Sequence, residues 1–496
     1  MICEMIKSKI FLPLLLTALM IFGCKENPRS SEGLSKEQLE AAYIQYKEAS
    51  LTDRRFKQAD IAPLIKSRSD DFLVEELGES IQEREIYQLA YGKGSTKVML
   101  WSQMHGNEST ATMALFDLFN FLEGRGDGFD SIRNPIRDQL NIRFIPMVNP
   151  DGAEKFRRRN ALDIDLNRDA LDESTPEAVL LKAARENFQP SFGFNLHDQQ
   201  IYYNVKGSRK PATISVLAPA YNEETEVNTV REKSMQLIVG MNQMLQQIVP
   251  GQVGKYDDAF EPRAFGDNFQ KWGTSTILIE SGGYPNDPEK QYIRQLNFMV
   301  ILDALYAIAT QNYEQYVLED YYAIPDNDSK LMDLILRKVS VELKGKYYQV
   351  DLGINRREVE LDSGFLSLGS ITDKGDLSVY YGYEEIHAEG FHYRQGNIWK
   401  GGFESLDHIT QEKALELLKQ GYMGIVVSTE NKGKLHRLPL VVVTQEKAFR
   451  SGHQIGGAAN FFLQQGEEVR YAIVNGFLID LKALNPTAGL GLQQVL

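Results

Sequence analysis

Residues 98–122, VMLWSQMHGNESTATMALFDLFNFL, contain a strand, a turn and a helix in succession. The apolar run Val98–Met104 is strand-like, and Ser109–Leu122 carries apolar residues at helical spacing. His105 and Glu108, two side chains able to bind a metal ion, occupy the turn between them. The stretch therefore predicts a β-turn-α unit with polar, chemically useful groups at the carboxyl end of its strand.

The same alternation extends over residues 61–315. Further strand-like runs are Ile142–Val148, Phe192–Leu196, Ile214–Ala218 and Thr276–Ile279, and helical patterns cover 176–188, 223–248 and 288–310. Alternating strands and helices predict an α/β domain with a mixed, largely parallel twisted sheet flanked by helices. In such sheets ligands bind beyond the carboxyl ends of the strands.

Histidine usage narrows the search for a metal site. The chain has seven histidines, but only His105 and His197 fall between residues 25 and 315, and each follows an apolar strand. His105, Glu108 and His197 would form a two-histidine, one-carboxylate set, which is typical of catalytic zinc sites that keep one position for water. The alternative is that His105 caps the following helix and His197 is a hydrogen-bonded strand-end residue. Both cysteines lie in the first 24 residues, so the body of the chain would bind a metal without thiolates.

Four more segments carry polar groups at fixed spacing. Glu280 ends the apolar strand at 276–279, and a buried carboxylate there is costly unless it is paired or functional. The others are the turn Asn149–Gly152 (NPDG), the basic run Arg157–Asn160 (RRRN) and the run Asp165–Arg168 (DLNR).

In order and spacing, these motifs resemble the zinc carboxypeptidase family over residues 60–315. The resemblance implies a zinc ion held by His105, Glu108 and His197, with Glu280 as general base and acid. It also implies that Arg158 stabilises the oxyanion and that Asn167 and Arg168 bind the terminal carboxylate of the substrate. Tyr256 is the nearest candidate for the family's substrate-capping tyrosine. Arg157 or Arg159 could take the place of Arg158, and Asp169 and Asp198 depart from the family pattern, which leaves the substrate open.

The amino terminus indicates export. Lys7 and Lys9 precede the apolar run Ile10–Phe22, which is shorter than the roughly 20 residues that span a bilayer and is typical of a signal peptide. The run continues into Gly23-Cys24, which resembles a bacterial lipobox. We therefore expect residues 1–24 to be a lipoprotein signal peptide, Cys24 to be lipidated and the protein to be anchored to the cell envelope, with Lys25 favouring the outer membrane. A plain secretory signal is the alternative.

The regions outside residues 61–315 have different sequence patterns. Residues 25–60 read as a tether and a short helix, and 316–329 as a linker. Residues 330–496 contain short strand-like runs separated by glycines and predict a β-rich accessory region of one or two modules. Acidic residues outnumber basic ones by 68 to 54, and a net charge of −14 argues against a nucleic-acid partner.

Together these features predict a lipid-anchored zinc metallocarboxypeptidase that cleaves an amide bond next to a free carboxylate in peptides or muropeptides. One alternative is a zinc-dependent deacylase of N-acyl amino acids. Another is a non-catalytic binding lipoprotein of the envelope.

Overall fold

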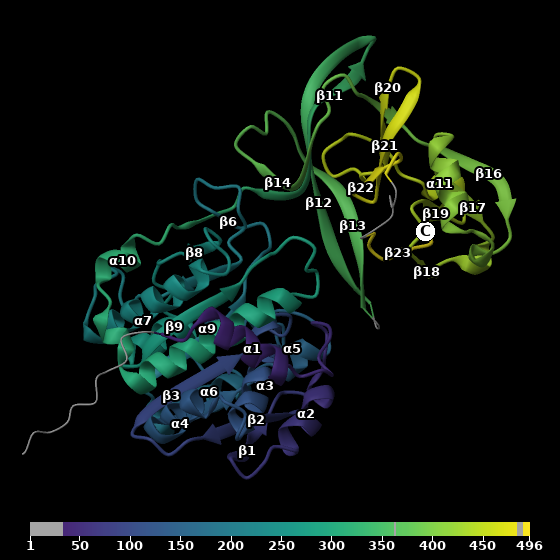
Figure 1. The fold of residues 1–496 in the computed structure, drawn as a ribbon. Coiled ribbons are helices and arrows are strands. Elements are labelled where there is room, and N and C mark those ends of the chain that lie inside the picture. The colour runs from purple at the N-terminus through teal and green to yellow at the C-terminus, as the bar shows by residue number, and fades with distance from the viewer. Residues whose placement is uncertain (1–32, 362–363, 484–489) are drawn as a thin grey trace, which may run out of the picture.

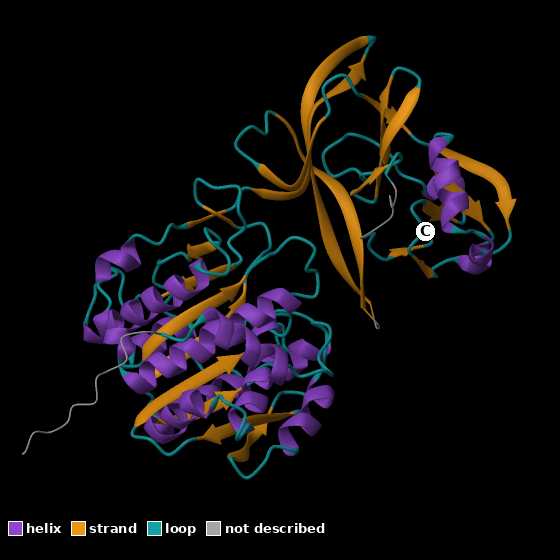
Figure 2. Ribbon diagram, viewed as in Figure 1, coloured by secondary structure: helices purple, strands orange, loops and turns teal. Residues whose placement is uncertain are grey.

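The computed structural model describes residues 33–361, 364–483 and 490–496. They form two parts, each built on its own sheet (Figure 1). Helices surround the first sheet, whereas the second part consists mainly of strands and loops (Figure 2). The predicted signal peptide, including Cys24, lies outside the described residues.

The first sheet has eight strands in the order β1-β2-β4-β3-β5-β9-β7-β8. The pairs β4–β3, β3–β5, β5–β9 and β7–β8 are parallel, and the others are antiparallel, which confirms the predicted mixed α/β sheet. The strands are β1 (Phe72–Glu79), β2 (Glu85–Tyr91), β3 (Thr96–Ser102), β4 (Leu140–Ile145), β5 (Phe192–Asp198), β7 (Ile214–Leu217), β8 (Val253–Lys255) and β9 (Ser275–Ser281).

Helices cover both faces of this sheet because its strands are apolar on both sides. On β3, Val98 and Leu100 enter one core, whereas Met99 and Trp101 enter the other. The helices are α1 (Lys36–Tyr46), α2 (Gln58–Lys66), α3 (Thr110–Glu123), α4 (Asp130–Gln139), α5 (Pro150–Glu154), α6 (Pro176–Phe188), α7 (Thr229–Gln246), α8 (Phe265–Lys271), α9 (Gln291–Thr310) and α10 (Leu318–Tyr322).

Helix α9 is the core helix of this part. Among the described residues it alone is long and apolar enough to cross a membrane by length and composition, but 72% of its most apolar window is buried inside the protein. Arg294 on α9 and Asp117 on α3 form an ion pair with fully buried side chains. The apolar character of α9 is therefore explained by packing against α3 and the sheet.

Two segments are more ordered than their composition suggests. Within residues 25–60, where the sequence predicts a tether and a short helix, the helix α1 docks on the core through Leu39 and Ala42, which are fully buried. Within 316–329, where the sequence predicts a linker, α10 forms and Tyr321 and Ile324 are buried. Aromatic and aliphatic side chains fix this connection against the first part.

The second part contains another eight-stranded sheet and a smaller layer with one helix. Its first three strands are long, unlike the short runs expected, because Gly353 and Gly369 lie inside strands and pack closely on Met332 and on the backbone of Asn475. The large sheet has β11 (Leu331–Leu343), β12 (Lys346–Leu361), β13 (Gly364–Gly375), β14 (Tyr381–His387), β15 (His392–Gln395), β20 (Phe461–Gln465), β21 (Glu468–Val474) and β22 (Phe477–Asp480).

The smaller layer packs on its own apolar core. It has β16 (Asn397–Phe403), β17 (Tyr422–Val427), β19 (Val441–Val443) and α11 (Gln411–Lys419), and beside it β18 (Leu435–His436) pairs with β23 (Gln493–Gln494). Two short strands, β6 (Asn204–Val205) and β10 (Asn327–Asp328), pair where the two parts of the chain meet.

Candidate metal centre and its cleft

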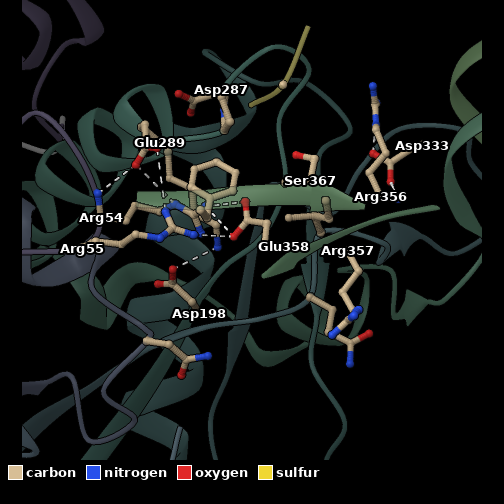
Figure 3. Close-up of a pocket in the computed structure, with 18 of the residues that line it drawn as sticks. Arg54, Arg55, Asp198, Asp287, Glu289, Asp333, Arg356, Arg357, Glu358 and Ser367 are labelled. Carbon is tan, nitrogen blue, oxygen red and sulfur yellow. Dashed lines mark hydrogen bonds and ion pairs between the residues drawn. The ribbon is translucent and has the colours of Figure 1, made fainter. Parts of the chain in front are cut away.

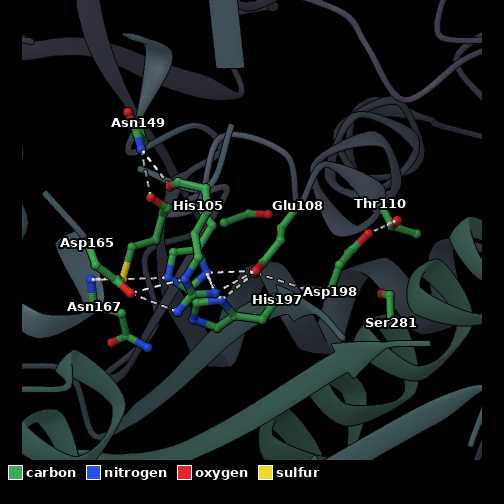
Figure 4. Close-up of polar contacts among 12 residues, drawn as sticks. His105, Glu108, Thr110, Asn149, Asp165, Asn167, His197, Asp198 and Ser281 are labelled. Carbon is green, nitrogen blue, oxygen red and sulfur yellow. Dashed lines mark hydrogen bonds and ion pairs between the residues drawn. The ribbon is translucent and has the colours of Figure 1, made fainter. Parts of the chain in front are cut away.

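Three buried side chains converge at the carboxyl ends of β3 and β5 (Figure 4). His105 Nδ1 lies 2.7 Å from Glu108 Oε1, and His197 Nδ1 lies 2.7 Å from Glu108 Oε2. The two Nδ1 atoms are 3.1 Å apart. One potential ligand atom from each residue lies within 4.8 Å of the others, so the structure brings together the three residues singled out in the sequence.

The turn that carries His105 and Glu108 is held by the NPDG segment. Asn149 Nδ2 donates to Met104 O, while Asn149 Oδ1 accepts from Gly152 N. Gly106 lies so close to this segment that a Cβ on it would be 2.0 Å from the carbonyl carbon of Gly152. The NPDG motif therefore acts as a support for the metal-binding turn.

Asp165 sets the orientation of the His105 ring. His105 Nε2 lies 3.1 Å from Asp165 Oδ1, and an ionised carboxylate can only accept, so Nε2 carries the proton. His105 Nδ1 is then left with a lone pair that faces His197 and Glu108. This arrangement, in which a carboxylate orders a metal-binding imidazole, is common in zinc sites.

The donor set fits a zinc ion. Tetrahedral ligands at zinc bond lengths lie about 3.3 Å from one another, close to the 3.1 Å between the two Nδ1 atoms. Burial alone would raise the pKa of Glu108, but the two adjacent imidazoles hold it well below its usual range. The carboxylate is therefore ionised and able to bind a cation.

Arg158 is the arginine of the basic run that reaches the centre. Its Nη1 lies 3.2 Å from Glu108 Oε1, and its Nε donates to Asp165 Oδ2 at 3.0 Å. The Arg159 guanidinium instead donates to Asp163 O, and Arg157 is exposed. Sequence spacing does not decide which of the three arginines faces the centre, and the structure shows that Arg158 does.

Glu280 lies beside the three candidate metal ligands, at the end of β9. It pairs in register with His197 on β5, and its side chain is buried with Oε2 lacking any hydrogen-bond partner among the described residues. Burial, with added repulsion from Glu108 and Asp198, raises the pKa of Glu280 well above its usual value. A buried carboxyl group with a free oxygen and a raised pKa is suited to proton transfer.

A buried network behind the centre is not evident from the sequence. Lys290 Nζ lies 3.0 Å from Asp198 Oδ2 and donates to Ser281 O, which joins the ends of β5 and β9. Asp198 also accepts from Thr110 Oγ1, and its backbone N–H donates to Glu108. Asp198, which departs from the family pattern, thus has a structural role. This role could not be predicted from the sequence, because Asp198 and Lys290 lie far apart along the chain.

The predicted substrate-binding residues are more dispersed. Asn167 Oδ1 accepts from Phe265 N, and Arg168 Nε lies 3.0 Å from Glu261, so both are engaged at the edge of the centre. Tyr256 follows β8 and contacts Tyr203 with ring centroids 6.1 Å apart in the cleft wall. Asp169 accepts hydrogen bonds from the backbone N–H groups of Ser174 and Thr175, which lie directly before α6.

A cleft of about 1730 Å³ lies in front of the centre. Glu108, Arg158 and Asp198 line it on the side of the first part. Arg356 and Glu358 on β12 and Ser367 on β13 line it on the accessory side (Figure 3). The accessory part therefore contributes directly to the cleft.

Comparison with known proteins agrees with this geometry. The family model described as zinc carboxypeptidase matches residues 61–241. Human carboxypeptidase D is 25% identical over 151 residues, or 26% of this chain and 11% of that protein. Mouse cytosolic carboxypeptidase 6 is 30% identical over 120 residues, or 22% of each. The chain thus spans only a small part of the curated relatives that it matches.

Solved structures with some similarity include a metallo-carboxypeptidase from Burkholderia cenocepacia, at a TM-score of 0.42 and 19% identity over 51% of this chain and 68% of that one. Another is bovine thrombin-activatable fibrinolysis inhibitor in complex with tick carboxypeptidase inhibitor, at a TM-score of 0.42 and 14% identity over 55% of this chain and 100% of that one. The match over residues 61–241 agrees with the buried His–Glu–His set, which could hold the zinc ion that this family uses. Residues 61–241 of this chain are thus similar to the zinc carboxypeptidase family, whose model they match.

Proposed function

We propose that this protein is a zinc-dependent metallocarboxypeptidase that hydrolyses the amide bond next to a free carboxylate in peptides. The observation that carries the proposal is the unpartnered, buried oxygen of Glu280 beside the converging side chains of His105, Glu108 and His197. A binding protein has no need for a buried acid of raised pKa next to a metal site. A zinc ion held by these three residues would act as a Lewis acid and lower the pKa of its bound water.

Side chains of this protein would carry out proton transfer, stabilisation of the developing charge and substrate binding. Glu280 takes a proton from the attacking water and returns it to the leaving nitrogen, because its free oxygen lies inside the buried site. Arg158, anchored by Asp165 through Nε, presents its guanidinium where negative charge develops on the carbonyl oxygen. The amide supplied by Asn167 and the guanidinium of Arg168 bind the substrate carboxylate once Arg168 exchanges Glu261 for it.

Substrate profiling with the purified 25–496 chain tests this function. The zinc-loaded protein should release single residues from the carboxyl ends of free-acid peptides and should leave the same peptides untouched when they end in an amide. A chelator should abolish release, and added zinc should restore it. Cleavage of N-acyl amino acids in place of peptides would instead favour the deacylase reading.

Glu280→Gln isolates the proposed general base. It should lower kcat by about 10²-fold or more, because general acid–base groups contribute on that scale, and leave the zinc content unchanged. Glu76→Gln, at an exposed position on β1, is the matched control. Full activity of Glu280→Gln would refute the mechanism.

Envelope anchoring remains part of the proposal. The support for it is the run Ile10–Phe22 followed by Gly23-Cys24, and an anchored enzyme at the envelope would meet both peptides and muropeptides. Metabolic labelling with a palmitate analogue should mark the full chain expressed in a bacterium that processes lipoproteins. Cys24→Ala should remove both the label and the membrane association, and a labelled Cys24→Ala protein would exclude this anchor.

A further inference from the structure

The outer wall of the cleft is built by the accessory part of the chain. The β12–β13 hairpin extends from the second sheet toward the catalytic part (Figure 1), and Arg356, Glu358, Phe365 and Ser367 from this hairpin line the cleft. At about 1730 Å³ the cleft is larger than the roughly 300–1,000 Å³ of sites for small ligands. It can hold several residues of an extended peptide, which must enter between the catalytic part on one side and the accessory part on the other.

Arg55 fastens this wall to the catalytic part. Its guanidinium lies between two aromatic rings, 4.4 Å from the centroid of Phe156 and 3.9 Å from that of Phe365 on β13. Its Nη2 lies 2.7 Å from Glu358, and its Nε lies 3.3 Å from Glu360. We call Arg55, Phe156, Glu358, Glu360 and Phe365 the Arg55 cluster.

The chemistry of the Arg55 cluster suits a stable contact. The Arg55 side chain is only 8% exposed, and the neighbouring Arg54 Nη2 adds a second ion pair to Glu358 at 2.8 Å. Guanidinium groups stack on aromatic rings and pair with carboxylates through a planar fork, which a more mobile ammonium cannot do. Glu358 and Glu360 are each 38% exposed, so salt will weaken the ion pairs without removing the stacking.

A second attachment lies on the loop that follows the metal ligand His197. Tyr202 Oη donates to Asp333 Oδ2 at 2.7 Å, and Tyr383 Oη donates to Ile201 O at 2.5 Å. The strand pair β6–β10 extends this connection. The wall is therefore held at two separate places, one of them four and five residues after the candidate metal ligand His197.

We propose that the accessory part acts as the specificity wall of the cleft and restricts the enzyme to flexible, extended chain ends. The carboxyl terminus of a folded domain cannot reach the metal centre past a wall held by the Arg55 cluster. This inference rests on the proposed peptidase function and goes further by naming the substrate class. The specificity residues are those of the Arg55 cluster, which do not touch the reacting atoms.

A pair of matched substrates tests the wall. One is a free peptide of about ten residues, and the other is a fusion in which only the last two residues of that peptide follow the last ordered residue of a stable folded domain. For the zinc-loaded 25–496 protein, kcat/KM for the free peptide should exceed that for the fusion by about tenfold or more. Equal cleavage of both substrates would overturn the inference, whereas cleavage of neither would refute the proposed function itself.

Variants of the Arg55 cluster should relax this preference. Arg55→Ala and Phe365→Ala should each reduce the ratio of free-peptide to fusion cleavage at least about threefold, because the wall can then move aside. Arg450→Ala is the matched control, since Arg450 is an exposed arginine of the accessory part that bonds only to backbone carbonyls and lies away from the cleft. An unchanged ratio in both cluster variants, with normal zinc content and thermal unfolding, would contradict the proposal.

A salt series on the unmodified protein gives an answer that does not depend on variants folding. Raising sodium chloride from about 0.1 M to about 1 M shortens the screening length from roughly 10 Å to roughly 3 Å. The same ratio should therefore fall with salt, while effects on the chemistry cancel because both substrates use one active site. A ratio that neither falls with salt nor changes in the cluster variants would remove the wall as the source of selectivity.

Discussion

Asp165 contacts both His105 and Arg158 and so connects the proposed zinc ligand to the proposed oxyanion group. Asp165→Asn should reduce zinc affinity by about 10–100-fold, since the carboxylate no longer orders the imidazole. Chelator competition would measure the change. Asp163→Asn, an exposed position nearby, is the control, and equal affinity in the two variants would contradict this role.

The three consecutive arginines give a second residue-level prediction. Arg158→Gln should lower kcat/KM by about 10²-fold, the usual effect of removing a group that stabilises developing charge. Arg159→Gln should change it little because its guanidinium bonds only to Asp163 O. Steady-state kinetics on one free-acid peptide would compare them, and a larger loss in Arg159→Gln would reverse the assignment.

At this scale the candidate metal ligands were predictable, because a histidine or an acid directly after an apolar strand is a local signal. The supporting residues were not. Lys290 lies 92 positions from Asp198, and no spacing rule joins an ammonium on the amino-terminal side of α9 to a strand end on β5.

At the scale of elements, the β3-turn-α3 unit depends on close backbone contact with the NPDG turn. Gly106→Ala would place a Cβ 2.0 Å from the Gly152 carbonyl carbon, so one backbone segment must shift. We expect a loss of stability of about 1–3 kcal/mol, as for other overpacked sites, together with weaker zinc binding. Urea denaturation would measure it, and Gly452→Ala, where a Cβ meets only open space, should be neutral. Normal stability and zinc binding in Gly106→Ala would show that the contact is dispensable.

The elements of the catalytic sheet followed from sequence periodicity, and those of the accessory part did so less well. The helical pattern at 176–188 predicts both ends of α6 correctly. The start of this helix is clear in the sequence because Thr175 caps it and Pro176 is its first residue. By contrast, β12 runs for 16 residues across Gly353. A glycine reads as a break in sequence, but here it makes room for Met332.

Asp303, the acid buried on α9, should make the stability of the whole molecule depend on pH. Asp303 is 7% exposed and accepts a hydrogen bond from Leu34 N, and burial raises its pKa to about 6. A raised pKa in the folded state means that its contribution is fully present below about pH 4, the unfolded pKa, and is lost as pH rises through about 6.

Asp303→Asn should therefore stabilise the protein by about 2–3 kcal/mol at pH 8 and have little effect at pH 4, since asparagine keeps the acceptor and never ionises. Chemical denaturation at the two pH values would measure this difference. Asp138→Asn, at an exposed site, is the control. A stabilisation of equal size at both pH values would rule out ionisation as its cause.

The arrangement of the two parts of the molecule lies beyond what the sequence predicts. Arg55 and Glu358 are separated by 303 positions, and their pairing depends on the complete fold. The composition of residues 330–496 indicated β-structure, but nothing in it showed that this region would form one side of the cleft. Interactions of this range become visible only when both sheets are in place.

The account depends most on one ion bound by two imidazoles and one carboxylate. Anomalous diffraction at the zinc edge from crystals of the 25–496 protein tests this directly. We predict a single strong peak at about 2.0–2.2 Å from His105 Nδ1, His197 Nδ1 and a Glu108 carboxylate oxygen. A peak bound by other residues, or none in protein supplied with zinc, would contradict the account.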